Sequence, residues 1–136
     1  MRDLDRRERN QRAITEFMEA IGMRDFDALA SICTEDFVAE LPYSDPPARF
    51  AGFEAYRAGV APKLEVFHFT LSTTQIHLGL EPDLIVAEYA GEGTAIPTGK
   101  PYRNIYIGVF RFRGGRICGL REFFNPTLGI RALESA

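Results

Sequence analysis

The chain has 136 residues, of which 46% are hydrophobic and 26% are charged, and its formal net charge is -3 at pH 7. This length suits one domain with one core, and 11 Phe and 5 Tyr supply enough bulky apolar surface to exclude a disordered chain. The negative charge excludes nucleic acid as a partner, because such binding needs a basic face. No apolar run approaches the ~20 residues that span a membrane, so we expect no membrane partner either.

The cysteines and the first residues indicate a compartment. Residues 1–12 are dense in Arg, Asp and Glu and lack the apolar stretch of a secretory signal. Cys33 and Cys118 have no Cys or His at metal-ligand spacing, so we expect no metal. We therefore expect a cytoplasmic protein with two reduced thiols, and a disulfide between them stays open as the alternative.

In chain order, the first half of the sequence predicts helices around one strand. Apolar residues recur at helical spacing after Asp3, the expected cap, and stop at Gly22. A second helix has Asp25 as its N-cap, and Pro62 is expected to close a third. The helices are predicted over residues 4–21, 26–33 and 53–60, the strand over residues 37–41, and a proline-rich loop over residues 43–51.

The second half of the sequence predicts one strand after another. Runs rich in Val, Ile, Thr and Tyr with a period of two are typical of strands, and Gly114-Gly115 marks a tight hairpin. The strands are predicted over residues 67–78, 84–93, 104–113 and 116–124, with a short helical tail over residues 128–133. Three helices with a long antiparallel meander predict an α+β domain whose helices lie on one face of a strongly curved sheet.

Both faces of the predicted strand over residues 104–113 are largely apolar. A sheet with one face in water should alternate cleanly with polar residues, so we expect both faces to be covered. The helices can cover only one face, which favours a homodimer; a C-terminal tail folded across the sheet is the alternative. The outer apolar stripe is predicted to contain Ile105, Ile107, Val109, Ile85, Ala87 and Tyr89.

Glu122 breaks the apolar pattern of the last strand. Strand alternation places it on one face with Cys118, Leu120 and Phe124. Burying a carboxylate without a partner costs several kcal/mol or raises its pKa until it is protonated. Two interpretations follow: a structural carboxylate paired with Arg103 or Arg121, or a polar group on the floor of an apolar pocket.

Other candidate residues are weaker. His68 and His77 lie nine apart, on opposite faces of one regular strand, which excludes a shared metal site without a bulge. Glu40, Glu88 and Glu92 fit solvated strand positions as well as a site. No Ser-His-Asp order and no glycine-rich phosphate loop is present, so we expect no cofactor.

Several segments resemble one known family. These are DFVAELP at residues 36–42, FAGFEA at 50–55, EYAGEGT at 88–94, TGKPYRN at 98–104 and REFFNP at 121–126. Over residues 6–133 the chain resembles the SnoaL-like branch of the nuclear transport factor 2-like fold, and its closing motif is similar to the phenazine-biosynthesis A/B proteins. The resemblance implies a cone: a strongly curved mixed sheet wrapped around a pocket closed by three N-terminal helices, usually in a dimer.

The resemblance carries over only at particular residues. Ketosteroid isomerases of this superfamily have a catalytic Asp where this chain has Leu41 and an oxyanion-binding Tyr where it has Phe17, which argues against their chemistry. The Asp-Arg-Asp set of the epoxide hydrolases has no convincing match. The Glu that acts as acid and base in the phenazine A/B proteins matches Glu122, whereas their ligand-contacting His has no match.

Together these features predict a small-molecule pocket protein. The leading hypothesis is a cofactor-free acid/base enzyme of secondary metabolism, of isomerase, cyclase or condensation type, that acts on an apolar carbonyl-bearing ligand. The alternatives are a non-catalytic binding protein of the same fold and a dimeric structural protein whose pocket is filled by its own side chains. Glu122 would carry the proton, Asn104 and Tyr106 would orient the ligand, Phe17, Tyr56, Phe110 and Phe124 would form the walls, and Tyr43 with Arg49 would lie at the mouth.

Overall fold

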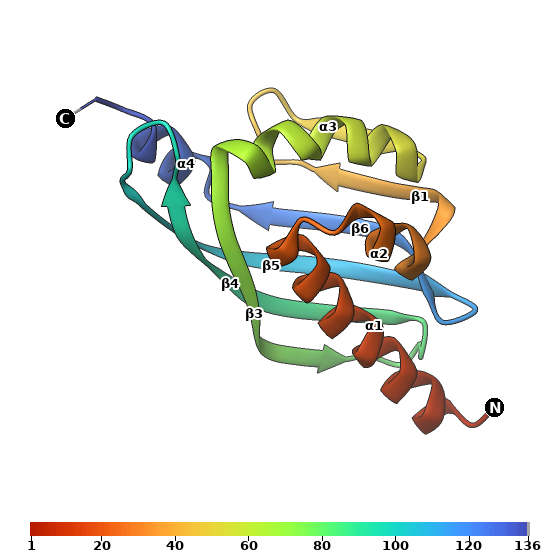
Figure 1. The fold of residues 1–136 in the computed structure, drawn as a ribbon. Helices are drawn as coiled ribbons and strands as arrows, with labels where there is room; N and C mark the ends of the chain where they lie inside the picture. Colours follow the sequence, from red (N-terminus) through yellow and green to blue (C-terminus); the bar gives the residue numbers. More distant parts are fainter. Residues whose placement is uncertain (136) are drawn as a thin grey trace.

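A six-stranded mixed sheet in the order β2-β1-β6-β5-β4-β3 forms the body of the computed structural model, which describes residues 1–135 (Figure 1). The strands are β1 (Cys33–Leu41), β2 (Ala48–Ala51), β3 (Phe67–Leu78), β4 (Leu84–Ala95), β5 (Pro101–Arg113) and β6 (Arg116–Phe124). All neighbours are antiparallel except β1 and β6, which run parallel. The predicted α+β class and the antiparallel meander of the second half are confirmed, and the parallel pair makes the sheet mixed.

Three helices lie over one face of the curved sheet, as predicted (Figure 1). They are α1 (Asp3–Met23), α2 (Phe26–Ile32) and α3 (Phe53–Val66). A fourth helix, α4 (Pro126–Ala132), follows β6 directly at the C-terminal end of the chain. No helix within residues 1–135 combines the length and the apolar composition that crossing a membrane requires.

The first two helices form close to where the sequence predicts them, but Arg2 and not Asp3 is the N-cap of α1, and no side-chain hydrogen bond caps this helix. In α1, Ile14, Phe17 and Ile21 recur at spacings of three and four and are almost fully buried against the sheet. The helix runs through Gly22 and stops at Arg24, which adopts the left-handed conformation with φ 54°. The side chain of Asp25 accepts a hydrogen bond from the Ala28 amide at 3.0 Å, so Asp25 is the N-cap of α2, as predicted.

Several element boundaries differ from the prediction, and β1 begins at Cys33 instead of Phe37. Pro62 does not close α3, which continues to Val66 with the proline inside it. An interior proline costs a helix about 3 kcal/mol, and the burial of Val60 and Leu64 on either side of Pro62 offsets that cost. The predicted loop over residues 43–51 is also partly wrong, because Ala48–Ala51 pairs with β1 as the edge strand β2.

A bulge changes which residues of β6 face the core. Arg111 pairs with Gly119 while the next residue, Phe112, pairs with Ile117, so Cys118 is the extra residue. Ile117 is therefore fully buried and Cys118 is only partly buried. The prediction that Cys118 shares a regular face with Leu120 and Glu122 is wrong, because a bulge resets the alternation.

The predicted outer stripe is half wrong. In the β4–β5 pair, Ile85 is opposite Phe110 and Tyr89 is opposite Tyr106. Residues directly opposite each other share a face, so Ile85, Ala87 and Tyr89 point into the core and are at most 1% exposed. The register that decides this depends on the turn between the strands, which alternation within one strand does not reveal.

The two cysteines do not pair. Both are free thiols, and Cys33 is buried at the start of β1. Desolvation raises the pKa of the Cys33 thiol to about 12. The thiol therefore stays protonated at neutral pH and contributes as a small apolar core residue.

Candidate functional site

A cavity of about 320 Å³ lies between the curved sheet and the helices, with a mostly apolar lining. This volume is at the lower end of the ~300–1,000 Å³ of typical small-molecule sites. Six residues predicted for the site line it: Phe17, Tyr56, Asn104, Tyr106, Glu122 and Phe124. Residues from α1, α3, α4 and from the four strands β1, β3, β5 and β6 contribute to the wall, so the cavity forms only when the whole domain folds.

Two residues predicted for the site lie elsewhere. Phe110 is fully buried in the core, with its ring edge-on to Phe17 at a centroid distance of 5.8 Å, and does not reach the cavity. Tyr43 is 61% exposed and packs edge-on against Phe123, 5.3 Å between centroids, outside the cavity. Its loop does reach the cavity, through the neighbouring Ser44 and Asp45.

Glu122 reaches the cavity from the middle of the sheet. It lies opposite Gly108 of β5, and the Tyr89 hydroxyl donates a short hydrogen bond to its carboxyl. Arg121 points to the other face, where its guanidinium lies 3.7 Å from the carboxylate of Glu40. Arg103 is likewise exposed on the outer face, opposite Glu92. Neither arginine pairs with Glu122. The interpretation of Glu122 as a structural carboxylate paired with Arg103 or Arg121 is therefore wrong.

The surroundings of Glu122 favour its neutral form. Burial raises the pKa of its carboxyl above the usual 4.5, and the Tyr89 hydrogen bond and the positive charge of Lys63 oppose this rise without cancelling it. The residue keeps a partly open surface because it borders the cavity. A raised pKa makes the ionised form of a carboxyl a stronger base than a free glutamate, which suits proton transfer.

Glycine at position 108 makes room for this contact. A Cβ atom at Gly108 would lie 2.8 Å from the Tyr89 hydroxyl oxygen and 2.6 Å from the Phe110 ring. Both distances are shorter than van der Waals contact, so a side chain here would displace Tyr89 from Glu122. The glycine therefore supports the site through the close approach that it allows.

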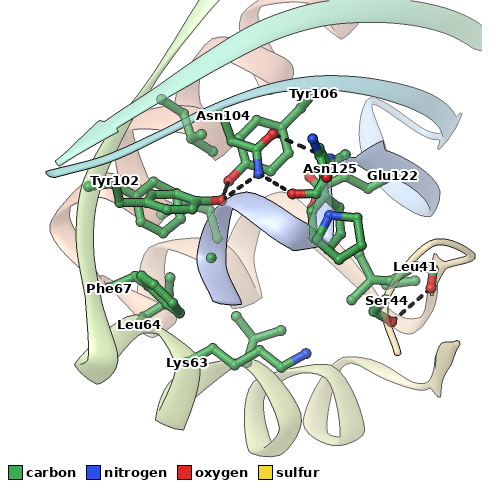
Figure 2. Close-up of a pocket in the computed structure, with 18 of the residues that line it drawn as sticks. Leu41, Ser44, Lys63, Leu64, Phe67, Tyr102, Asn104, Tyr106, Glu122 and Asn125 are labelled. Carbon is green, nitrogen blue, oxygen red and sulfur yellow. Dashed lines mark hydrogen bonds between the residues drawn. The ribbon is translucent and has the colours of Figure 1, made fainter. Parts of the chain in front are cut away.

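Asn104 is the centre of a polar network on the same face of the sheet as Glu122, on the adjacent strand β5 (Figure 2). Its side-chain nitrogen donates to the Tyr102 hydroxyl at 3.0 Å and to the carbonyl oxygen of Asn125 at 2.8 Å. Its side-chain oxygen accepts from the backbone amides of Ile105 at 2.9 Å and of Asn125 at 3.3 Å. The network therefore joins β5 to the residue that caps α4.

The hydroxyl oxygens of Tyr102 and Tyr106 lie 2.6 Å apart and both side chains line the cavity (Figure 2). The Tyr106 ring stacks on the Tyr89 ring, with 5.2 Å between centroids and 5° between planes. Burial raises the pKa of both Tyr102 and Tyr106. Both phenols are therefore neutral hydrogen-bond donors at physiological pH.

Sequence reasoning missed several cavity residues. Tyr102 lies two residues before Asn104 and therefore on the same face, so strand alternation contained the signal. Lys63 of α3 enters the wall opposite Tyr102 because the helix continues past Pro62 (Figure 2). Gly129 and Ile130 of α4 also line the cavity. No pattern in the sequence places that short helix against the opening.

The two residues that distinguish this chain from ketosteroid isomerases also line the cavity. Leu41 and Phe17, which the resemblance aligns with the carboxylate and the phenol of those enzymes, are both in the cavity wall. Glu40, one residue before Leu41, points outward to Arg121. The cavity thus has a buried carboxyl on β6 and a hydroxyl pair on β5.

Comparison with known proteins agrees with this architecture. The chain is 36% identical over 100 residues to a PhzA/B-like protein of Pseudomonas aeruginosa, covering 71% of this chain and 70% of that protein. It is 29% identical over 120 residues to YesE of Bacillus subtilis, covering 85% and 80%.

Solved structures share the fold. A candidate isomerase from Bacillus subtilis superposes with a TM-score of 0.87 at 25% identity, covering 100% of this chain and 98% of that one. A phenazine biosynthesis-related protein of Pseudomonas aeruginosa superposes with a TM-score of 0.77 at 22% identity, covering 96% and 83%. The model of the SnoaL-like domain matches residues 14–120. The chain therefore belongs to the SnoaL-like domain family and has the fold of nuclear transport factor 2-like proteins.

Proposed function

We propose that this protein is a cofactor-free acid/base enzyme of secondary metabolism, of isomerase, cyclase or condensation type, that acts on a small, apolar, carbonyl-bearing molecule. The observation that carries the proposal is Glu122, a carboxyl with no arginine partner and a raised pKa, set in a largely apolar cavity. Structures of the same fold include proteins described as candidate polyketide cyclases and an epoxide hydrolase, which agrees with small-molecule chemistry.

The proposed step is proton abstraction next to a carbonyl group. A C–H bond of the ligand breaks, its proton moves to a Glu122 oxygen, and the electron pair becomes an enolate. In an isomerisation Glu122 returns the proton to another carbon of the enolate. In a cyclisation the enolate carbon attacks a second carbonyl carbon, and the Glu122 proton moves to the new alkoxide oxygen. Both routes balance without an oxidant or a reductant.

The test uses 2-tetralone, a flat bicyclic ketone with acidic protons next to its carbonyl. In deuterated water we expect the protein to accelerate deuterium exchange at those carbons, followed by proton NMR. Glu122→Gln keeps the shape of the side chain and removes the proton carrier, so the acceleration should fall by about 10²–10⁴-fold. Exchange that is unchanged in Glu122→Gln would remove Glu122 from the mechanism.

A matched control separates the cavity from the surface. Glu92 is an exposed carboxylate on β4, which β5 separates from β6, and Glu92→Gln should leave the exchange rate unchanged. A wild-type protein that binds 2-tetralone without accelerating exchange would instead be a binding protein.

We also propose a homodimer through the outer face of the sheet. Ile105 is 73% exposed and Ile107 is 42% exposed on this face, and Val109 and Phe123 are only partly covered. A contiguous apolar surface of this kind supports a partner subunit.

The two free thiols support our further proposal that the protein works in the reducing cytoplasm.

A further inference from the structure

The orientation of the Asn104 amide is fixed by its neighbours. One side-chain atom faces the backbone N–H groups of Ile105 and Asn125, so that atom must be the acceptor oxygen. The other atom is therefore the NH₂ group, which faces the Asn125 carbonyl and the Tyr102 hydroxyl. The amide is 5% exposed and uses both of its ends, so it has no freedom to flip.

In this orientation the Tyr102 hydroxyl oxygen accepts a hydrogen bond from Asn104. The hydroxyl protons of Tyr102 and Tyr106 are then the two donors that need an acceptor. The Tyr102 and Tyr106 hydroxyls can share only one hydrogen bond with each other, at 2.6 Å, and that bond uses one of the two protons. The second proton meets no acceptor within residues 1–135, and the hydroxyl that carries it borders the cavity whichever tyrosine it belongs to. The pair therefore presents one unused O–H donor to the cavity.

We propose that the Tyr102–Tyr106 pair donates this O–H to the carbonyl oxygen of the bound ligand, and that Asn104 is the positioning residue that makes the pair a donor. This inference rests on the proposed function, whose ligand it describes more closely: a neutral molecule with one carbonyl oxygen on the β5 side and its acidic C–H near Glu122. Polarisation along the chain from Asn104 to the terminal hydroxyl strengthens the last donor. Such a donor stabilises the negative charge that the oxygen gains when Glu122 removes the proton.

The direction of the hydrogen-bond chain gives Asn104 a testable role. In Asn104→Asp the NH₂ group is replaced by a carboxylate oxygen that can only accept. Tyr102 would then donate to the introduced carboxylate and Tyr106 would donate to Tyr102, so both protons would be used inside the protein. The variant keeps both hydroxyls and loses the free donor, which a purely structural role for Asn104 does not predict.

The experiment measures the carbonyl stretch of 2-tetralone, labelled with carbon-13 at the carbonyl, by infrared difference spectroscopy of the bound probe. In the wild type we expect the band to shift to lower wavenumber than in an apolar solvent. In Tyr102→Phe/Tyr106→Phe the shift should disappear, and binding should weaken by about fivefold, the value of one neutral hydrogen bond. In Asn104→Asp the shift should disappear while the carboxyl is ionised and return as the pH is lowered enough to protonate it.

The control is Tyr43→Phe, which removes a phenol hydroxyl outside the cavity and should leave the band in place. A shifted band that persists in the double phenylalanine variant overturns the role of the pair, and one that persists in Asn104→Asp at every pH overturns the role of Asn104. A wild-type protein that does not bind 2-tetralone overturns the ligand class.

The variant Tyr102→Phe/Tyr106→Phe keeps the test decisive if Asn104→Asp does not fold.

The acid/base role of Glu122 and the donor role of the tyrosine pair would be contradicted by different results. Glu122-dependent deuterium exchange without a shift of the carbonyl band would contradict only the donor role of the hydroxyl pair. A shifted carbonyl band without deuterium exchange would contradict only the enzymatic function.

Discussion

The two faces of β5 invert the usual distribution of side chains. The inner face carries Tyr102, Asn104 and Tyr106, whose polar groups are almost fully buried, and the outer face carries Ile105 and Ile107, which are exposed. The inner polar groups avoid the cost of desolvation because they hydrogen-bond to one another. The outer isoleucines have no such compensation within one subunit. The comparison supports the proposals of a ligand on the inner face and of a partner subunit on the outer face.

The largest expected difference between the faces is in folding stability. Phe110→Ala removes a fully buried ring next to Phe17 and should lower the free energy of unfolding by about 3–5 kcal/mol. Ile105→Ala on the outer face should change it by no more than about 0.5 kcal/mol in dilute, monomeric protein. Urea unfolding of both variants measures the comparison. Equal losses would mean that the outer face is already covered in the measured state.

The second prediction concerns assembly through the outer face. Ile107→Lys places a charge in the middle of the proposed interface, where it would be buried without a partner, and should dissociate the dimer. Sedimentation velocity at micromolar concentration measures the outcome. Thr15→Lys adds the same charge at an exposed position of α1 and should leave the dimer intact. A wild-type monomer under these conditions would reject the dimer.

A smaller effect should distinguish two glycines on neighbouring strands. Gly108→Ala brings a methyl group within 2.8 Å of the Tyr89 hydroxyl oxygen and should cost about 1–3 kcal/mol of stability and slow the Glu122-dependent exchange. Gly119→Ala meets its nearest atoms at 3.6 Å, an ordinary contact, and should be nearly neutral. Thermal unfolding and exchange rates of the two variants test this. A neutral Gly108→Ala would show that Tyr89 can move without loss.

The smallest effect is the pH dependence of stability. Because the pKa of Glu122 is raised in the folded state, its ionisation opposes folding. This penalty is absent below about pH 4.5, the usual value for Glu, and grows as the pH rises through the folded pKa. Glu122→Gln should therefore become increasingly more stable than the wild type across this window, measured as the difference in Tm. The opposite trend would indicate an ion pair, with Lys63 as the nearest cation.

Much of the fold followed from local patterns. The strands of the second half were predicted close to their observed bounds because alternation with β-branched residues is a strong local signal. Gly114 and Gly115 both have positive φ, 61° and 80°, as a tight hairpin requires. The errors have non-local causes: β2 exists because β1 offers it an edge, and α3 passes Pro62 because its later residues pack on the core.

The candidate site divides in the same way. Alternation within one strand was enough to place Glu122, Asn104 and Tyr106 on the cavity side, because side-chain direction in a strand depends only on parity until a bulge intervenes. The alternation of side chains along a strand does not show which inward-facing residues line a cavity and which are packed in the core. Phe110 is inward and fully packed, whereas Tyr102 is inward and lines the cavity.

The sequence by itself determined the α+β class, the inward direction of Glu122 and the absence of a cofactor motif, since these depend on composition and on spacing along one element. Only the tertiary structure decided the register of β4 against β5, the hydrogen bond from Tyr89 to Glu122 and the unused proton of the Tyr102–Tyr106 pair. Each of these depends on distances between residues far apart in the chain. Turn geometry, bulges and the packing of helices set those distances, and no local pattern encodes them.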